Sequence, residues 1–350
     1  MNTRIRILPI LLVVAVMLTV TSASALTSGY TDIAGNWAED VIDRWVDYGV
    51  LTIGSPGASS KPGSNTGGRR GSSPSPAPGS TQTADTKFRP NDHITRGELA
   101  LIISNMMRYQ TVGTAVYNDV DADNVPEAQR DAIRKCAAAG VMQGSAGFMS
   151  PLGLITREQA VVMIGRAMEI TPSDVPSASF RDIAEISPYA KNMVLTFKER
   201  GYVIGGGDGY FNPKSNMTRA EAVKLLDNIV VNGLYSKPGV FTVSSMGNVV
   251  INVDKVELKG ATITGDLIIS EGVGDKGSVT LTDVTVNGTV FIRGGSDLIL
   301  NGQCKLGDVR QLKTKSSVKI RGGVSGIIEK LTVAPGSGAM TLSALPGGSR

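Results

Sequence analysis

The sequence predicts a multidomain protein in which an all-α unit, built from three copies of one repeat, precedes an all-β module. A Thr-Arg-x-Glu/Gln tetrapeptide occurs three times, at starts 61 and 62 residues apart, so the chain contains an internal repeat. Apolar residues at helical spacing follow each copy. From about residue 240 the composition changes to short alternating runs of Val, Ile, Thr and Gly, which is typical of strands.

Each tetrapeptide has the chemistry of a helix N-terminus. A threonine stands three residues before a Glu or Gln, which is the spacing of a capping box. These pairs are Thr95 and Glu98, Thr156 and Gln159, and Thr218 and Glu221. The residue after each threonine is an arginine: Arg96, Arg157 and Arg219. A positive charge at this end of a helix is unfavourable by roughly 0.3 to 1 kcal/mol, so we expect the arginines to have another purpose.

The rest of the repeat is recovered by aligning the copies on these caps. An aromatic-x-Asp-aliphatic segment opens each copy and contains Asp32, Asp119 or Asp182. A first helix follows and ends at Gly49, Gly140 or Gly201. The second helix of the first copy carries a stripe at i, i+3, i+4 and i+7, formed by Leu99, Ile102, Ile103 and Met106, and the other copies match it. Each repeat is therefore predicted to be a pair of helices.

This pattern resembles the S-layer homology (SLH) domain over about residues 28 to 235. The resemblance implies a pseudo-threefold trimer of helical hairpins, with grooves that bind a secondary cell-wall polysaccharide through a pyruvylated N-acetylmannosamine end. It implies that Arg96, Arg157 and Arg219 face the pyruvate carboxylate, beside helix N-termini whose free amides favour anions. The alternative is that each arginine forms an ion pair with an Asp of a neighbouring repeat, namely Asp32, Asp119 or Asp182.

Aromatic residues near the start of the first helix are the second set of candidate ligand contacts. Trp37 and Tyr189 occupy equivalent positions, where each could stack on a sugar ring or pack within its hairpin. The second repeat departs from the pattern, because it has Ala128 at this position and Gln159 in place of Glu. We expect a groove that relies on the first helix of the second repeat to bind least well.

The start of the chain resembles a secretory signal peptide over residues 1–25. It has Arg4 and Arg6, an apolar run over 7–20 and an Ala-Ser-Ala cleavage site that ends at Ala25. The apolar run is shorter than the roughly 20 residues that span a bilayer, so no membrane span is expected in the mature chain. The repeats are then predicted over 26–112, 113–176 and 177–239. A Gly-, Ser- and Pro-rich insertion over 55–86 interrupts the first one and is expected to be disordered.

The module predicted over 240–340, before a flexible tail over 341–350, shows its own repeats. Residues 261–269 resemble 284–292 at a spacing of 23, and weaker similarities follow at 306–309 and 325–328, each 19 residues on. Strand runs that recur about every 20 residues favour a short β-helix or solenoid, and the module resembles the bactofilin-like domains. A small β-sandwich is the alternative.

Composition restricts the function classes. The formal charge of +4 falls to about +2 without the signal peptide, so no nucleic-acid partner is expected. One histidine, His93, and two cysteines, Cys136 and Cys304, are too few for a metal site or disulfide framework, and no cofactor is expected. Five acidic residues of the β-rich module could supply a catalytic carboxylate pair, but none has an informative spacing. They are Asp254, Glu257, Asp266, Asp283 and Asp297.

These observations together predict a secreted, non-enzymatic surface protein, held noncovalently to an anionic cell-wall polysaccharide by its helical repeats. An alternative is a structural S-layer subunit that self-associates through the β-rich module. A cell-wall-anchored glycan-active enzyme is a further alternative.

Overall fold

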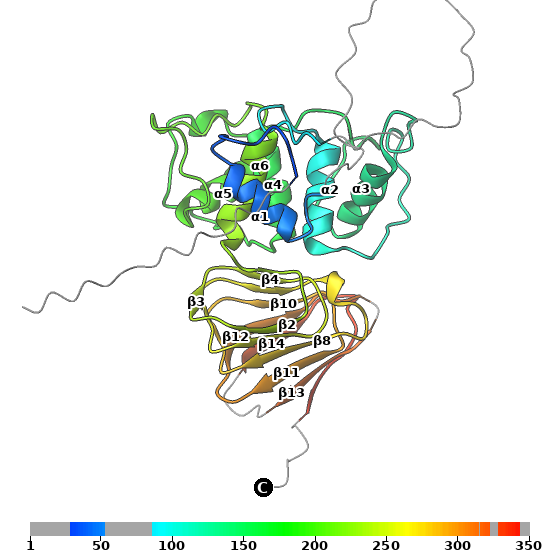
Figure 1. Cartoon of the computed structure of the whole chain (residues 1–350), viewed down its shortest axis with the longest axis vertical. Coiled ribbons are helices and arrows are strands. Elements are labelled where there is room, and N and C mark those ends of the chain that lie inside the picture. The colour runs from blue at the N-terminus through cyan, green and yellow to red at the C-terminus, as the bar shows by residue number, and fades with distance from the viewer. Residues whose placement is uncertain (1–28, 53–85, 315, 323–327, 344–350) are drawn as a thin grey trace, which may run out of the picture.

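The computed structural model describes residues 29–52, 86–314, 316–322 and 328–343. Six α-helices gather at one end of the molecule and the strands gather at the other (Figure 1). The predicted signal peptide and nearly all of the predicted insertion lie outside the described residues. Within the described ranges, no helix has both the length and the apolar character needed to cross a membrane.

Each repeat contributes two helices, as predicted. The first helices of the repeats are α1 (Glu39–Asp47), α3 (Glu127–Ala138) and α5 (Pro188–Glu199). The second helices are α2 (Arg96–Met107), α4 (Arg157–Ala167) and α6 (Arg219–Val230). All three predicted capping boxes are present, including the one completed by Gln159. Pro126 precedes α3 as its N-cap, which its fixed φ allows.

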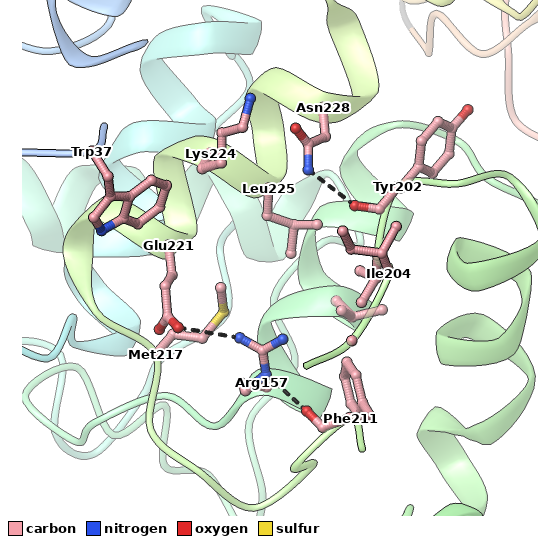
Figure 2. Close-up of a pocket in the computed structure, with 13 residues that line it drawn as sticks. Trp37, Arg157, Tyr202, Ile204, Phe211, Met217, Glu221, Lys224, Leu225 and Asn228 are labelled. Carbon is pink, nitrogen blue, oxygen red and sulfur yellow. Dashed lines mark hydrogen bonds and ion pairs between the residues drawn. The ribbon is translucent and has the colours of Figure 1, made fainter. Parts of the chain in front are cut away.

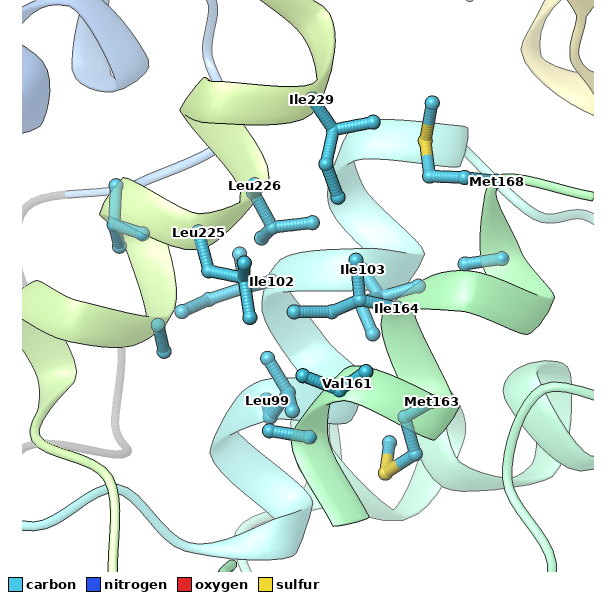
Figure 3. Close-up of a cluster of buried hydrophobic side chains, with 14 of the residues drawn as sticks. Leu99, Ile102, Ile103, Val161, Met163, Ile164, Met168, Leu225, Leu226 and Ile229 are labelled. Atoms are coloured by element: carbon cyan, nitrogen blue, oxygen red, sulfur yellow. The ribbon is translucent and has the colours of Figure 1, made fainter. Parts of the chain in front are cut away.

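The second helices meet at the centre of the helical unit and bury their predicted apolar stripes against one another. Figure 3 shows Leu99 and Ile103 of α2, Ile164 of α4, and Leu226 of α6 converging there. The first helices lie outside this centre, and each packs mainly on the second helix of the preceding repeat: α3 on α2, α5 on α4, and α1 on α6. The trimer is therefore assembled from helix pairs that join neighbouring repeats.

A closed ring of backbone hydrogen bonds lies where the second helices begin. The residue before each capping threonine is buried and bonds to its equivalents: the amide of Ile94 donates to the carbonyl of Met217 at 2.9 Å, Met217 donates to Ile155 at 3.0 Å, and Ile155 donates to Ile94 at 3.1 Å. Each repeat thus donates one bond and accepts one bond. This ring ties the first repeat to the third as closely as to the second.

Asp227 of α6 also links the third repeat to the first. Its carboxylate accepts hydrogen bonds from the indole Nε1 of Trp45 at 3.1 Å and from the guanidinium of Arg44 at 2.9 Å. Trp45 is completely buried, so its N–H has no access to water. The cluster fixes α1 against α6, although residues 53–85 separate α1 from the rest of its repeat.

The β-rich module is a parallel β-solenoid of about four turns, so the β-sandwich alternative is wrong. The first turn contains β1 (Leu234–Tyr235), β2 (Gly239–Thr242) and β3 (Ser245–Met246). The next two contain β4 (Val249–Ile251), β5 (Val256–Lys259), β6 (Thr262–Ile263), β7 (Leu267–Ile269), β8 (Ser278–Thr282) and β9 (Thr285–Val286). The remaining strands of the solenoid are β10 (Val290–Ile292), β11 (Asp297–Asn301), β12 (Lys305–Gln311), β13 (Val318–Gly322), β14 (Ile328–Val333) and β15 (Met340–Ser343).

The strand register confirms one predicted repeat and corrects another. Leu267 pairs with Val290 and Ile263 with Val286, at the predicted spacing of 23. The last predicted similarity is out of register, because Leu306 pairs with Ile328 and not with residue 325. The solenoid also begins at Leu234, before the predicted boundary at 240, and β15 extends to Ser343 into the predicted tail.

One face of the solenoid packs directly on the helical unit. Val250, Ile268 and Phe291 are the central residues of β4, β7 and β10, and they join the core of the helices. Two buried asparagines bond across the same boundary: Asn252 Nδ2 donates to the carbonyl of Met106 at 2.7 Å, and Asn248 Nδ2 donates to that of Ile229 at 3.0 Å. The solenoid therefore shares a core with the helical unit.

Candidate ligand-binding grooves

The arginine that opens each second helix extends across to the next repeat. Its Nε donates to the backbone carbonyl of Met149, Phe211 or Phe88, at 2.9, 2.9 and 2.7 Å. The helix amides beside it are already bonded: in α2, Arg96 N donates to Gly153 and Gly97 N to Pro151, both at 2.9 Å. The expectation of free amides at these helix ends is therefore wrong. An anion here would depend on side chains.

The arginines do not pair with the aspartates that open the repeats, so that alternative is wrong. Each of these aspartates accepts two backbone amides of its own repeat. Asp182 Oδ1 and Oδ2 accept from Phe211 and Asn212 at 2.9 and 2.7 Å. Asp32 and Asp119 are bonded in the same way. The aspartates thus fasten the start of each repeat to its connector.

Two of the arginines pair instead with the capping-box glutamate of the following repeat. Each glutamate divides its oxygens: Glu98 Oε2 accepts the amide of Thr95 at 2.8 Å, and its Oε1 pairs with Arg219 at 2.7 Å. Glu221 caps Thr218 at 2.9 Å and pairs with Arg157 at 3.4 Å. The capping box and the inter-repeat ion pair therefore share one side chain.

The groove at Arg157 contains the first predicted aromatic. A cavity of about 150 Å³ is lined by Arg157, Trp37, Glu221 and Lys224, over an apolar floor that includes Leu225. In Figure 2 the guanidinium of Arg157 lies between the Glu221 carboxylate and the Phe211 carbonyl, with Trp37 above. The side chain of Trp37 is 62% exposed, so packing within a hairpin does not account for it.

The groove at Arg96 is larger and contains the second predicted aromatic. Its cavity of about 690 Å³ is lined by Arg96, Gln159, Arg166 and Tyr189, among others. Tyr189 is 58% exposed, and its hydroxyl donates to Glu158 at 3.3 Å. Burial lowers the pKa of Arg96 below its usual value, which Tyr189 and Asp119 partly offset. Among the described residues, no carboxylate forms an ion pair with Arg96 or Arg166.

The third arginine is enclosed. The side chain of Arg219 is 14% exposed, that of Glu98 is 13% exposed, and the guanidinium lies 5.0 Å from the ring centre of Phe88. Ala128 lies in the first turn of α3, which packs on α2 and has Gln129 beside Gly97, so Ala128 belongs to this groove by the pseudo-threefold relation. The sequence analysis assigned Ala128 and Gln159 to one groove, and this was wrong: Gln159 lies in the Arg96 groove.

The comparison with protein families decides the nature of the helical unit. The S-layer homology domain model matches residues 82–100, 120–161 and 179–223, which include all three arginines and their caps. The chain carries three SLH repeats. The first helix of repeat 1, α1, lies outside the match, because it precedes residue 82.

Curated relatives include both enzymes and surface proteins. The chain is 27% identical over 215 residues to the amylopullulanase of Thermoanaerobacterium thermosulfurigenes, covering 60% of this chain and 10% of that protein. It is 28% identical over 202 residues to the exoglucanase XynX of Acetivibrio thermocellus, covering 56% and 16%. The surface-layer 125 kDa protein of Lysinibacillus sphaericus is 26% identical over 153 residues, covering 43% and 13%. The chain thus spans a small fraction of each relative's length.

SLH repeats bind cell-wall polymers and anchor surface proteins to the wall, so they indicate a location at the cell surface or cell wall.

The acidic residues singled out in the solenoid have structural partners. Asp254 accepts the amide of Ser278 at 2.7 Å, and Asp297 pairs with Arg321 at 2.5 Å. Glu257, Asp266 and Asp283 are likewise bonded. No cluster of three or more His, Cys, Asp or Glu suited to a metal occurs in the described ranges.

Arg166 is the lining residue that sequence reasoning missed. It occupies the position of Asn105 and Asn228 in the other SLH repeats, ten residues after the capping threonine. Those asparagines donate to the carbonyls of Val50 and Tyr202, at 3.0 and 3.2 Å. Comparing the three copies at this position would have identified the arginine as a departure from a structural residue.

Glu158, beside the Arg96 groove, gives a test by pH. Burial alone raises the pKa of this carboxyl, but hydrogen bonds from Lys214 and Ser187 outweigh it, so the pKa is lowered in the folded SLH unit. A lowered pKa contributes stability above the unfolded-state pKa, which is lost as the pH falls through the folded value. We expect Glu158→Gln to destabilise the protein at pH 7 and to have a smaller effect in strong acid. Denaturant unfolding at both pH values measures this, and an equal effect at both would contradict it.

Proposed function

We propose that the protein is held noncovalently to the cell wall by an anionic, pyruvylated secondary cell-wall polysaccharide that binds in the grooves between its SLH repeats. The observation that carries this proposal is the pairing of arginine and exposed aromatic in two grooves, Arg96 with Tyr189 and Arg157 with Trp37. A pyruvate ketal presents a carboxylate beside a sugar ring. An arginine donates charge-assisted hydrogen bonds to the carboxylate, and an aromatic ring can stack on the sugar ring.

The fixed geometry of the arginines supports this role. Because Nε is bonded to a carbonyl of the next repeat, the guanidinium is held in place before a ligand arrives. Little side-chain entropy is then lost on binding. The cost is that each site depends on two repeats, so binding requires the closed SLH trimer.

We propose no catalytic role for the solenoid. The five acidic residues considered above accept hydrogen bonds from backbone amides and a hydroxyl or form ion pairs with basic side chains. These bonds support a structural or display function. The shared core with the helices would hold the solenoid in a fixed orientation relative to the wall. Export through a signal peptide over residues 1–25 remains part of the proposal.

Cosedimentation with purified cell walls tests the anchoring. The full chain is expected to sediment with walls that carry the polymer, to remain in solution with walls from which the polymer has been extracted, and to be released by a chaotrope. The full chain is required because removing the solenoid would expose the buried residues of the helices that pack on Val250 and Ile268. Equal sedimentation with extracted walls would contradict the proposal.

A further inference from the structure

We propose that Gln159 makes the groove at Arg96 the principal acceptor of the polymer's anionic group, with Arg166 as a second cation, and that the equivalent glutamates partly close the other two grooves. This inference rests on the proposed function, since it specifies which site the polymer occupies. It assigns ligand selection to a residue that also completes a helix cap.

The glutamates compete with a ligand because they are themselves carboxylates. Glu221 Oε1 lies 3.4 Å from Arg157 and Glu98 Oε1 lies 2.7 Å from Arg219. An incoming carboxylate must displace this internal partner or share the arginine with it. The shorter, less exposed pair at Arg219 is the harder to displace, so the grooves form a series in which Arg219 is the most closed.

Gln159 keeps the cap but removes the competitor. Its Oε1 accepts the amide of Thr156 at 3.2 Å, as the glutamates do. The amide group Nε2 therefore takes the place of the oxygen that pairs with arginine in the other repeats. An amide nitrogen donates hydrogen bonds and cannot accept one from a guanidinium. The Gln159 amide and the Arg96 guanidinium can therefore donate hydrogen bonds to the same anion.

The surroundings of Arg96 also leave its positive charge available to a ligand. Its Nε and Nη2 are bonded to the carbonyls of Met149 and Gln143, at 2.9 and 3.1 Å, which orient the group without neutralising its charge. Arg166 lines the same cavity and has no carboxylate partner among the described residues. The nearby acidic groups are engaged: Asp119 holds the amides of Met149 and Ser150, and Glu158 binds Lys214.

The cavity volumes favour the same groove as the charges do, namely the groove at Arg96. The Arg96 groove encloses about 690 Å³ and the Arg157 groove about 150 Å³. A sugar that carries an anionic substituent needs several hundred cubic ångströms to be largely buried. The Arg96 groove provides this volume, and Tyr189 stands at its side.

Calorimetric titration of the full chain with pyruvylated N-acetylmannosamine tests the inference, with unmodified N-acetylmannosamine as the uncharged control. The wild type is expected to show one dominant site. Gln159→Glu should supply Arg96 with an internal partner and weaken that site at least about tenfold, the loss of one charge-assisted hydrogen bond. Glu221→Gln is the matched variant, and it should strengthen binding at Arg157 and raise the stoichiometry toward two.

The outcomes separate this inference from the proposed function. Gln159→Glu should melt at or above the wild-type temperature, because it restores an ion pair, so weaker binding would not reflect misfolding. Unchanged affinity in Gln159→Glu, or equal occupancy of all grooves in the wild type, would overturn the inference while cosedimentation still succeeds. If the wild type neither binds this sugar nor sediments with polymer-bearing walls, the proposed function itself fails.

Discussion

Replacing Arg96 and Arg157 together with alanine is expected to weaken binding of the polymer by about 10² to 10⁴-fold. Each arginine supplies a charge-assisted hydrogen bond whose loss costs about 1.5 to 3 kcal/mol. Because a polymer can engage both grooves of one molecule, the two losses multiply and together give this range. The two single variants should each retain a measurable part of the affinity, with Arg96→Ala the weaker binder.

Arg219→Ala is the matched control for this experiment. It also removes an arginine from the start of a second helix, together with an Nε bond to a carbonyl, at 2.7 Å. Its charge is already paired with Glu98, so we expect some loss of stability and little loss of binding. Binding isotherms and melting curves of the four variants measure both effects. A double variant that melts earlier but binds the polymer like the wild type would make the arginines structural only.

Replacing Asp227 with alanine is expected to lower the free energy of unfolding by about 3 kcal/mol. The substitution leaves the completely buried N–H of Trp45 without an acceptor, which costs about 1 to 3 kcal/mol. It also unpairs Arg44, although this side chain is 32% exposed and recovers part of its solvation. Because α1 reaches α6 through this cluster, the first repeat should loosen first.

Two variants distinguish the causes of that loss. Asp227→Asn keeps an oxygen for Trp45 and removes the charge, so it should lose less than the alanine variant. Lys224→Ala removes only a half-exposed partner, whose Nζ lies 3.4 Å from Asp227, and should change stability by less than 1 kcal/mol. Urea unfolding monitored by Trp fluorescence reports on all three. Equal stability of the Ala and Asn variants would show that the Trp45 bond contributes little.

The local features of the helices could be predicted from the sequence, and the partners of the arginines could not. Capping boxes and apolar stripes depend on residues three or four positions apart, so Thr95, Glu98 and Leu99 were assigned correctly. The partner of Arg219 is Glu98, which lies in a different repeat and meets it only because the trimer closes. The packing of repeat 1 on repeat 2 brings Gln159 to the groove of Arg96. A pattern shared by three aligned copies does not show which copy contacts which.

The solenoid register shows the same limit. The spacing of 23 between 261–269 and 284–292 was found because both turns have matching lengths. The turn that links Leu306 to Ile328 is 22 residues long, whereas the prediction used 19. Strand pairing fixes which residues stack, but the loops between strands vary in length, so a fixed spacing fails over successive turns. The buried cluster inside the solenoid is nevertheless apolar, with Leu267, Val290 and Leu306 among its members.

The backbone ring through Ile94, Ile155 and Met217 gives the two repeat arrays of this chain different evolutionary freedom. A solenoid is open at its end, so a duplicated turn adds one more layer and leaves the others unchanged. A ring in which every member donates to one neighbour and accepts from the other has no place for a fourth member. Unequal recombination could therefore lengthen the solenoid gradually, whereas the helical array could grow only by whole sets of three.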